Sequence, residues 1–479
     1  MTSKASPAPA RGTRPAEQAP GISFLQYASA ARRALLIGIV AFVPLLVVYG
    51  AGFRDPFNTP KVALLIFGII VAAAIRGAEA IAGAPGSGMT RLILPAMSFS
   101  IPFFAAWLAS PDHDFALWGW DYGRYQGLAP YLLAVALGVL IADGFAGRAH
   151  QIAWALAAAG TAVSAYAIVQ FLGWDVFPSG PGWSGGGRAV TTLGNPNFTG
   201  GFLAICLAAT LPLALGKARA ATLAKVMGYA IAIGVGRSYS QGAWIAAIGG
   251  VAVALGIMIA PRLTWARMAG TAVAVFVAVG SIGAALVAIA GVDLSVLSTV
   301  RSRGLTWETA LRAAEDELLL GHGLNSFGQV QTRYRSDEAA ADQTRRRSVP
   351  DDPHSVPLAM LVNAGLLSFL GFVGVISWFV VQAIRVPAGN QAGAACVGAI
   401  TAYLTQALVS IDEVSLRVTF WVCLGALAAF HAGRKAPDGR RPVPKPVGRV
   451  RMVVAGAFVV VAVVTSASWA VRFIELHKV

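Results

Sequence analysis

The chain has 479 residues, of which 56% are hydrophobic and only 12% are charged, against about 25% charged residues in a soluble domain. Its long apolar runs are typical of lipid-facing helices and exclude a soluble multidomain protein. The formal charge of +15 does not indicate nucleic-acid binding, because the basic residues lie in short segments between the apolar runs. A disulfide framework is also excluded, because the three cysteines all lie inside apolar runs: Cys206, Cys396 and Cys423.

The N-terminal segment, residues 1–30, is rich in Ala, Pro and Arg and contains no recognisable cleavable signal peptide. It predicts a disordered tail on the cytoplasmic side. A single transmembrane domain is expected to follow over residues 31–472.

Thirteen apolar runs are long enough to be candidate spans, since a bilayer core needs about 17–25 residues per helix. The fold class that they predict is all-α, a polytopic transmembrane bundle of about 12–13 helices. The candidate spans are residues 34–50, 62–75, 92–109, 128–142, 152–172, 198–215, 220–235, 243–259, 269–290, 364–384, 393–409, 418–432 and 453–469.

The charges of the connecting segments predict the orientation. With the N-terminus inside and the spans alternating, the inside segments hold 21 of the 37 Lys and Arg but only 4 of the 22 Asp and Glu. Because cytoplasmic loops are rich in Lys and Arg, the N-terminus is expected in the cytoplasm. The net charge of the chain therefore reports topology rather than a binding partner.

One polar segment on the non-cytoplasmic side, residues 112–127, is aromatic. It contains Trp118, Tyr122, Arg124 and Tyr125. Aromatic rings with polar partners suit contacts with a glycan or an acceptor, and they equally suit the aromatic belt at a membrane interface. Both readings stay open.

Another non-cytoplasmic polar segment combines a cation with a helix start. Arg188 precedes a run that contains Asn195, Pro196 and Asn197, and an apolar span begins at Phe198. An Asn cap and an arginine beside a helix N-terminus attract phosphate, although the same residues also make an ordinary turn and cap.

The next non-cytoplasmic connection is very short and contains Arg237 and Gln241, which are four residues apart and could share a helix face. An arginine at membrane depth is costly and is a functional candidate, whereas snorkelling to the interface is the structural alternative.

A long polar loop, residues 291–356, follows and is predicted to contain helices. Arg301 and Arg303 near its start could clamp a diphosphate or form a solvated basic patch. At its end, His354 directly precedes a span and could act as a general base or bind a phosphate. No pattern of metal ligands or nucleotide-binding glycines accompanies these residues, so no metal or other cofactor is predicted.

Four stretches together resemble the bacterial O-antigen ligase and O-antigen polymerase superfamily. They are the Thr-Leu-Gly-Asn-Pro-Asn run at 192–197, Ser-Gln-Gly-Ala-Trp at 240–244, the segment from Trp307 to Phe327, and His354 followed by Asn-Ala-Gly-Leu at 363–366. The resemblance covers residues 119–421. The chain departs from the family pattern at Gln241, where an arginine is usual, and at Ser355, where an asparagine is frequent.

The resemblance implies a glycosyltransferase in the bacterial inner membrane that needs no metal or other cofactor. Such enzymes take a glycan from undecaprenyl diphosphate at the periplasmic face and pass it, with inversion, to lipid A–core, to a second lipid-linked glycan or to a protein hydroxyl. By analogy, His354, Arg237 and Arg188 would be catalytic. The diphosphate would be bound by Arg188, Arg237, Arg301, Arg303, Gln241, Asn195 and Asn197.

Two other classes remain open at this stage. An anion transporter of the bicarbonate type could also use arginines, but transporters usually place their sites near the membrane midplane with repeat symmetry, and no internal repeat is visible. A non-catalytic scaffold is the third possibility. Among the transferases, the features favour a ligase over a polymerase or a protein O-oligosaccharyltransferase.

Overall fold

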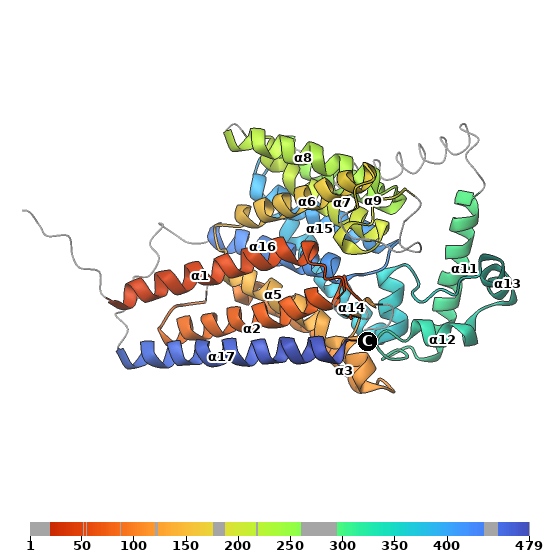
Figure 1. Ribbon diagram of the computed structural model, residues 1–479, viewed down its shortest axis with the longest axis horizontal. Helices are drawn as coiled ribbons and strands as arrows, with labels where there is room; N and C mark the ends of the chain where they lie inside the picture. The colour runs from red at the N-terminus through yellow and green to blue at the C-terminus, as the bar shows by residue number, and fades with distance from the viewer. Residues whose placement is uncertain are drawn as a thin grey trace, which may run out of the picture.

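The computed structural model describes residues 20–50, 52–53, 55–86, 88–119, 123–175, 187–216, 219–259, 295–434 and 449–478. These residues form helices and connecting loops and contain no strand, so the predicted all-α class is confirmed. The long helices run side by side along one axis (Figure 1). They are α1 (Pro20–Phe42), α2 (Thr59–Ile81), α3 (Met89–Leu108), α5 (Leu128–Gly144), α6 (His150–Phe171), α7 (Pro196–Ala214), α8 (Arg219–Arg237), α9 (Gln241–Ile259), α14 (Val356–Ile384), α15 (Gln391–Ala407), α16 (Val414–Arg434) and α17 (Arg449–Leu476).

The remaining elements lie in the connections of the bundle. Three helices follow one another in the long polar loop and lie together at one end of the bundle (Figure 1). The connecting elements are η1 (Val43–Leu45), α4 (His113–Trp118), η3 (Thr191–Leu193), α11 (Ser295–Asp316), α12 (Phe327–Tyr334) and α13 (Asp337–Arg346).

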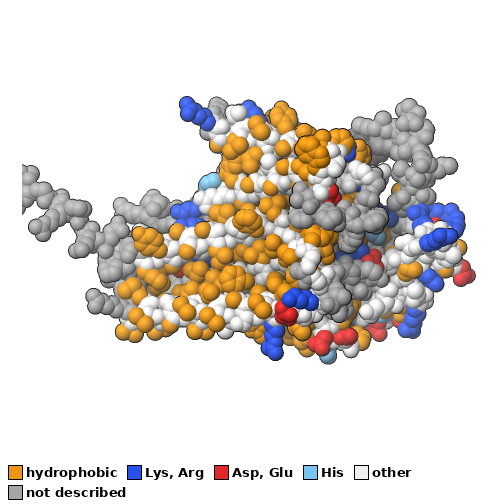
Figure 2. Space-filling model, in the orientation of Figure 1, with side chains coloured by type: hydrophobic (Ala, Val, Ile, Leu, Met, Phe, Trp, Pro, Cys, Tyr) orange, Lys and Arg blue, Asp and Glu red, His pale blue; other side chains and the backbone are white. Residues whose placement is uncertain are grey.

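The bundle has the surface of a multi-pass membrane protein. Nine helices in the described part of the chain are long and apolar enough to cross a bilayer, and α5 is a shorter apolar helix. Hydrophobic side chains cover the bundle, whereas charged side chains gather mainly over α11–α13 (Figure 2). Twelve of the thirteen predicted spans lie on helices, and the remaining one, residues 269–290, lies outside the described residues. The predicted spans on α8 and α15 do not reach the length and hydropathy of the other nine.

The first helix begins earlier than the composition of the N-terminus predicts. Helix α1 starts at Pro20, so the second part of the segment expected to be a disordered tail is helical. Leu25 and Arg32 are buried against the rest of the bundle, which explains why these residues are ordered with the helix.

Helix α16 forms the centre of the bundle and is buried along its length. It packs against α5 and α15. The backbones of α5 and α16 approach closely because glycines face each other: a Cβ on Gly138 would lie 2.6 Å from the carbonyl oxygen of Trp421. In a membrane, lipid is as apolar as the helix surfaces, so the hydrophobic effect does not drive helices together. Contacts between small residues let the helices associate by close van der Waals packing instead.

Helix α14 is broken near its N-terminal end, and the break attaches the polar loop to the bundle. Gly365 has φ +75° and ψ 178°, which only glycine adopts without strain. The chain that follows α11 enters this break: the Leu366 amide donates to the carbonyl of Leu318 at 2.7 Å, and the His322 amide donates to the carbonyl of Val362 at 2.9 Å. The backbone groups that the break frees are therefore satisfied by the polar loop.

We predict that Gly365→Ala destabilises the protein, because a Cβ at this position would collide with the Leu319 carbonyl and force a strained backbone. The expected result is a lower yield of monodisperse protein and a lower thermal unfolding midpoint. Gly256→Ala is the matched control, since nothing lies within 4 Å of its Cβ position. Equal midpoints for the two variants would contradict this account of the break.

Candidate functional site

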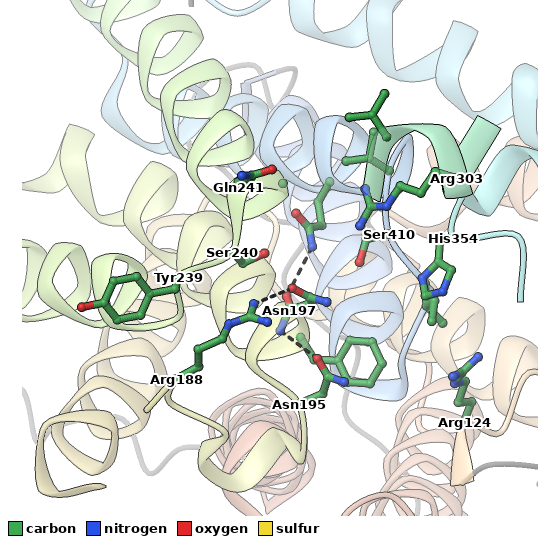
Figure 3. A pocket seen from close by; sticks show the side chains of 16 residues that line it. Arg124, Arg188, Asn195, Asn197, Tyr239, Ser240, Gln241, Arg303, His354 and Ser410 are labelled. Atoms are coloured by element: carbon green, nitrogen blue, oxygen red, sulfur yellow. Dashed lines mark hydrogen bonds between the residues drawn. The ribbon is translucent and has the colours of Figure 1, made fainter. Parts of the chain in front are cut away.

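A cavity of about 440 Å³ lies at the end of the bundle nearest α11–α13, which we call the bundle cavity (Figure 3). It collects residues from six separated segments of the chain. Its lining residues are Arg124, Arg188, Asn195, Asn197, Phe198, Tyr239, Ser240, Gln241, Gly242, Val300, Arg303, His354, Gln406, Val409, Ser410 and Ile411.

Helix N-termini surround the bundle cavity. Helices α7 and α9 begin at residues that line it or directly follow lining residues, and α14 begins two residues after His354. At the start of α7, the Asn195 side chain accepts a hydrogen bond from the Asn197 amide at 2.8 Å. Because N-termini carry partial positive charge and unpaired N–H groups, this arrangement favours an anion in the cavity.

The charged side chains of the bundle cavity are all cationic. Arg124, Arg188 and Arg303 line it, and no Asp or Glu is among its described lining residues. Arg188 projects from one side, opposite Arg303 and His354 (Figure 3). Burial lowers the pKa of both Arg188 and Arg303, because the charged form loses solvation. Since a guanidinium nevertheless stays protonated, the cavity is suited to an anionic group.

Arg188 is held in a fixed position. Its Nε donates to the Ser238 carbonyl at 3.0 Å, and one terminal nitrogen donates to Asn197 Oδ1 at 2.9 Å. Arg303 has no hydrogen-bond or ion-pair partner among the described residues and comes from α11 of the polar loop. The two arginines therefore reach the cavity from opposite parts of the fold and leave donor groups for a ligand.

His354 lies in a tightly constrained turn before α14. Its backbone has φ +56°, and its amide donates to Asp352 Oδ1 at 2.7 Å. The preceding carbonyl, on Pro353, accepts from the Trp307 indole at 3.0 Å. Burial, and then the nearby Arg124 and Arg303 guanidiniums, lower the His354 pKa to about 4. The imidazole is therefore neutral at physiological pH and able to accept a proton.

The carboxylates beside His354 do not line the bundle cavity. Asp351 forms an ion pair with Arg124, and Asp352 accepts a hydrogen bond from the Gln126 side chain at 3.2 Å. Burial raises the Asp352 pKa to about 6. These contacts fix the turn that presents the imidazole.

Backbone strain is concentrated around the bundle cavity. Four non-glycine residues with positive φ lie in or next to its lining segments: Tyr125 at 52°, Thr191 at 52°, Tyr239 at 47° and His354 at 56°. Left-handed backbone in such residues is uncommon and persists where the surroundings impose it. Strain at four separate segments around one cavity supports a functional role for it.

Seven of the predicted site residues line the bundle cavity. They come from four predicted features that lie far apart in the sequence. These residues are Arg124, Arg188, Asn195, Asn197, Gln241, Arg303 and His354.

Arg237 and Arg301, both predicted to bind diphosphate, do not line the cavity. The Arg237 guanidinium lies 3.6 Å from the centre of the Phe171 ring and donates to the Tyr239 hydroxyl at 2.8 Å. Arg301 is exposed and pairs with Glu338 on α13. Arg237 instead supports the cavity wall, because its carbonyl accepts from the Ala189 amide at 3.1 Å, next to Arg188.

Two of the aromatic residues predicted to contact a glycan, Trp118 and Tyr125, do not line the cavity. The Trp118 ring packs on Phe473 with ring centroids 4.8 Å apart. Tyr125 is buried, and its hydroxyl hydrogen-bonds Thr59 at 2.6 Å. Tyr122 lies outside the described residues. Among the described residues of this group, Arg124 alone lines the bundle cavity.

Two polar residues that were not predicted also line the cavity, one in the last turn of α15 and one three residues beyond its end. Gln406 donates from Nε2 to the Asn197 carbonyl at 3.3 Å, and its buried Oε1 has no hydrogen-bond partner among the described residues. Ser410 lies one turn further along the chain and faces the same space (Figure 3). The signal for Gln406 in the sequence is a polar amide inside the apolar run 393–409, whereas Ser410 directly follows that run.

The segment between α15 and α16 is anchored by two buried ion pairs. Lys61 Nζ lies 3.3 Å from Glu413 Oε1, and both side chains are fully buried. Asp412 pairs with Arg417 at 2.8 Å and also accepts from the Tyr131 hydroxyl at 2.9 Å. These contacts position Ser410 and the neighbouring wall of the cavity.

Residues 226–373, roughly a third of the chain, match the family model described as O-antigen ligase, and this segment includes Gln241, Arg303 and His354. No curated protein matches the chain. The match bears out the predicted resemblance over residues 226–373, where the chain is similar to the O-antigen ligase family.

Proposed function

We propose that this protein transfers a glycan from undecaprenyl diphosphate to an acceptor hydroxyl, and that it acts as an O-antigen ligase on lipid A–core. The observation that carries the proposal is the meeting of Arg188, Arg303 and His354 at one cavity that has no Asp or Glu among its described lining residues. The asymmetry of Lys and Arg between the connecting segments supports an inner-membrane orientation with this cavity facing the periplasm.

The diphosphate of the donor fits the cationic part of the bundle cavity. Arg188 and Arg303 can each offer two parallel N–H groups to phosphate oxygens, and the N-termini of α7 and α9 add backbone donors. As the glycosidic bond breaks, negative charge accumulates on the leaving diphosphate. Cations already fixed around that charge lower the barrier without reorganising solvent.

His354 completes the reaction on the acceptor side. The neutral imidazole removes the proton from the acceptor hydroxyl as its oxygen bonds to the anomeric carbon. The bond from that carbon to the diphosphate oxygen breaks, and its electron pair leaves with undecaprenyl diphosphate. With attack opposite the leaving group, the anomeric centre inverts, and no metal or nucleotide is consumed.

A strain that lacks the gene, complemented with wild-type or variant protein, tests this function. We expect Arg188→Ala to reduce transfer by about 10²-fold, the usual effect of removing one charge-stabilising group. Arg237→Ala is the matched control, because this arginine supports the wall but does not line the cavity, and a reduction of less than about tenfold is expected. The measurement is silver staining and quantification of envelope glycans.

The staining pattern also identifies the acceptor. Loss of long chains from lipid A–core, with lipid-linked chains accumulating, supports the ligase. Glycans that stop at a single repeat indicate a polymerase, and loss of glycan from proteins indicates a protein O-oligosaccharyltransferase. Envelope glycans that are unchanged in the deletion strain refute all three transferase activities.

A further inference from the structure

A second cavity, of about 530 Å³, lies within the polar loop and shares two residues with the bundle cavity. We call it the loop cavity. It lies between α11, α13 and the segment 348–354, and its volume is in the range of small-molecule sites. Arg303 and His354 line both cavities, so these two side chains form the boundary between them.

The two cavities differ in charge. The carboxylates that line the loop cavity, Asp342 and Asp351, both form ion pairs: Asp342 Oδ2 lies 3.0 Å from Arg346 Nε, and Asp351 pairs with Arg124. The lining charges of the loop cavity are thus largely neutralised within the protein. Arg124 of the bundle cavity is the partner of Asp351, but Arg188 has no carboxylate partner among the described residues, so an anion is favoured in the bundle cavity more than in the loop cavity.

Uncommitted hydrogen-bonding groups line the loop cavity. The Ser302 and Ser348 hydroxyls have no hydrogen-bond partner among the described residues, and neither does the Arg303 guanidinium. Hydroxyls can both donate and accept. A neutral ligand rich in hydroxyl groups matches this lining better than a phosphate or an apolar group.

We propose that the loop cavity binds the acceptor, presenting the uncharged, hydroxyl-rich end of a glycan to His354. This inference rests on the proposed function and adds the location and chemical class of the acceptor site. The attacking oxygen and the leaving oxygen must lie on opposite sides of the anomeric carbon. A diphosphate in the bundle cavity and a hydroxyl arriving from the loop cavity satisfy that requirement, with His354 at the boundary.

Two variants test the acceptor site in purified protein. Ser348→Trp fills part of the loop cavity, and Ser302→Val removes one free hydroxyl. The matched control is Thr344→Trp, because Thr344 is also exposed on this part of the loop and does not line the cavity. The donor is lipid-linked glycan extracted from the deletion strain, and the acceptor is either its lipid A–core or a second portion of the lipid-linked glycan.

The expected result is a rise of about tenfold or more in the KM for the acceptor with Ser348→Trp, and a smaller rise with Ser302→Val. The donor KM and the thermal stabilisation by added undecaprenyl diphosphate should stay within twofold of wild type. The acceptor whose KM rises identifies the source of the glycan.

The outcomes separate the two proposals. Active variants with an unchanged acceptor KM overturn the acceptor site and leave the transferase function intact. A rise in the donor KM alone also overturns it, because the loop cavity would then hold the donor glycan. If the wild-type protein transfers glycan to neither acceptor, the proposed function fails and the acceptor site fails with it.

Discussion

Replacing His354 by alanine is expected to slow glycan transfer by about 10²–10⁴-fold, the usual contribution of a positioned general base. The imidazole lies at the boundary of both cavities, whereas the donor diphosphate is assigned to the arginines. Stabilisation of the protein by undecaprenyl diphosphate should therefore survive His354→Ala. Single-turnover rates and thermal shifts measured on the same preparation would separate these two effects.

The pH dependence of transfer follows from the lowered His354 pKa of about 4. Only the neutral imidazole accepts a proton, so the transfer rate should fall as the pH drops toward 4. A histidine with the ordinary pKa of 6.5 would instead lose activity near that pH. Asp352, with a pKa raised to about 6, can add a separate limb, because its carboxylate holds the His354 amide. Asp352→Asn should remove that limb and keep the lower one.

His113→Ala is the control for this prediction. His113 is exposed near the same end of the bundle and hydrogen-bonds the Leu108 carbonyl at 3.1 Å. Its loss should leave transfer unchanged. Wild-type rates in folded His354→Ala protein would exclude His354 as the base, whatever its position.

The fold could be predicted because hydrophobic segments long enough to cross a bilayer leave few alternatives. Twelve of the thirteen predicted spans lie on helices of the described chain. The break in α14 was not predictable, since Gly365 lies inside an apolar run and glycine is tolerated in such helices. Only the incoming chain at Leu318–His322 shows why the helix must open there.

The candidate site could be predicted in part. Arg188 and His354 were recognisable because each lies in a short polar segment directly before a span. Helical spacing placed Arg237 and Gln241 on one face, but the turn between α8 and α9 separates them: Gln241 lines the cavity and Arg237 stacks on Phe171. Contacts of this kind depend on tertiary packing, which cannot be predicted from the spacing of residues along the sequence.

The buried pair of Lys61 and Glu413 shows the limit of sequence reasoning most clearly. Its members are 352 residues apart, and each belongs to a segment that reads as an ordinary polar flank of a span. Neither side chain is exposed. Their pairing links α2 to the segment before α16, which forms one wall of the bundle cavity.

Lys61→Met is expected to destabilise the protein by about 3–5 kcal/mol, because it leaves the Glu413 carboxylate buried without its cation. Adding Glu413→Gln to this variant should recover more than half of the lost free energy of unfolding. The amide oxygen of Gln can still accept from the Ser415 amide, which now donates to Glu413 at 2.9 Å. Unfolding in mixed micelles of increasing denaturing detergent would give the four free energies of a double-mutant cycle.

The cycle also tests whether the pair matters to the site. If the pair positions the wall that carries Ser410, Lys61→Met should raise the donor KM, and the double variant should lower it again as stability returns. If Lys61→Met were as stable as wild type, water would have to reach and solvate the Glu413 carboxylate. The double variant could also regain stability while its donor KM stays high. That result would show that the charges of the pair, rather than the packing around them, position the wall that carries Ser410.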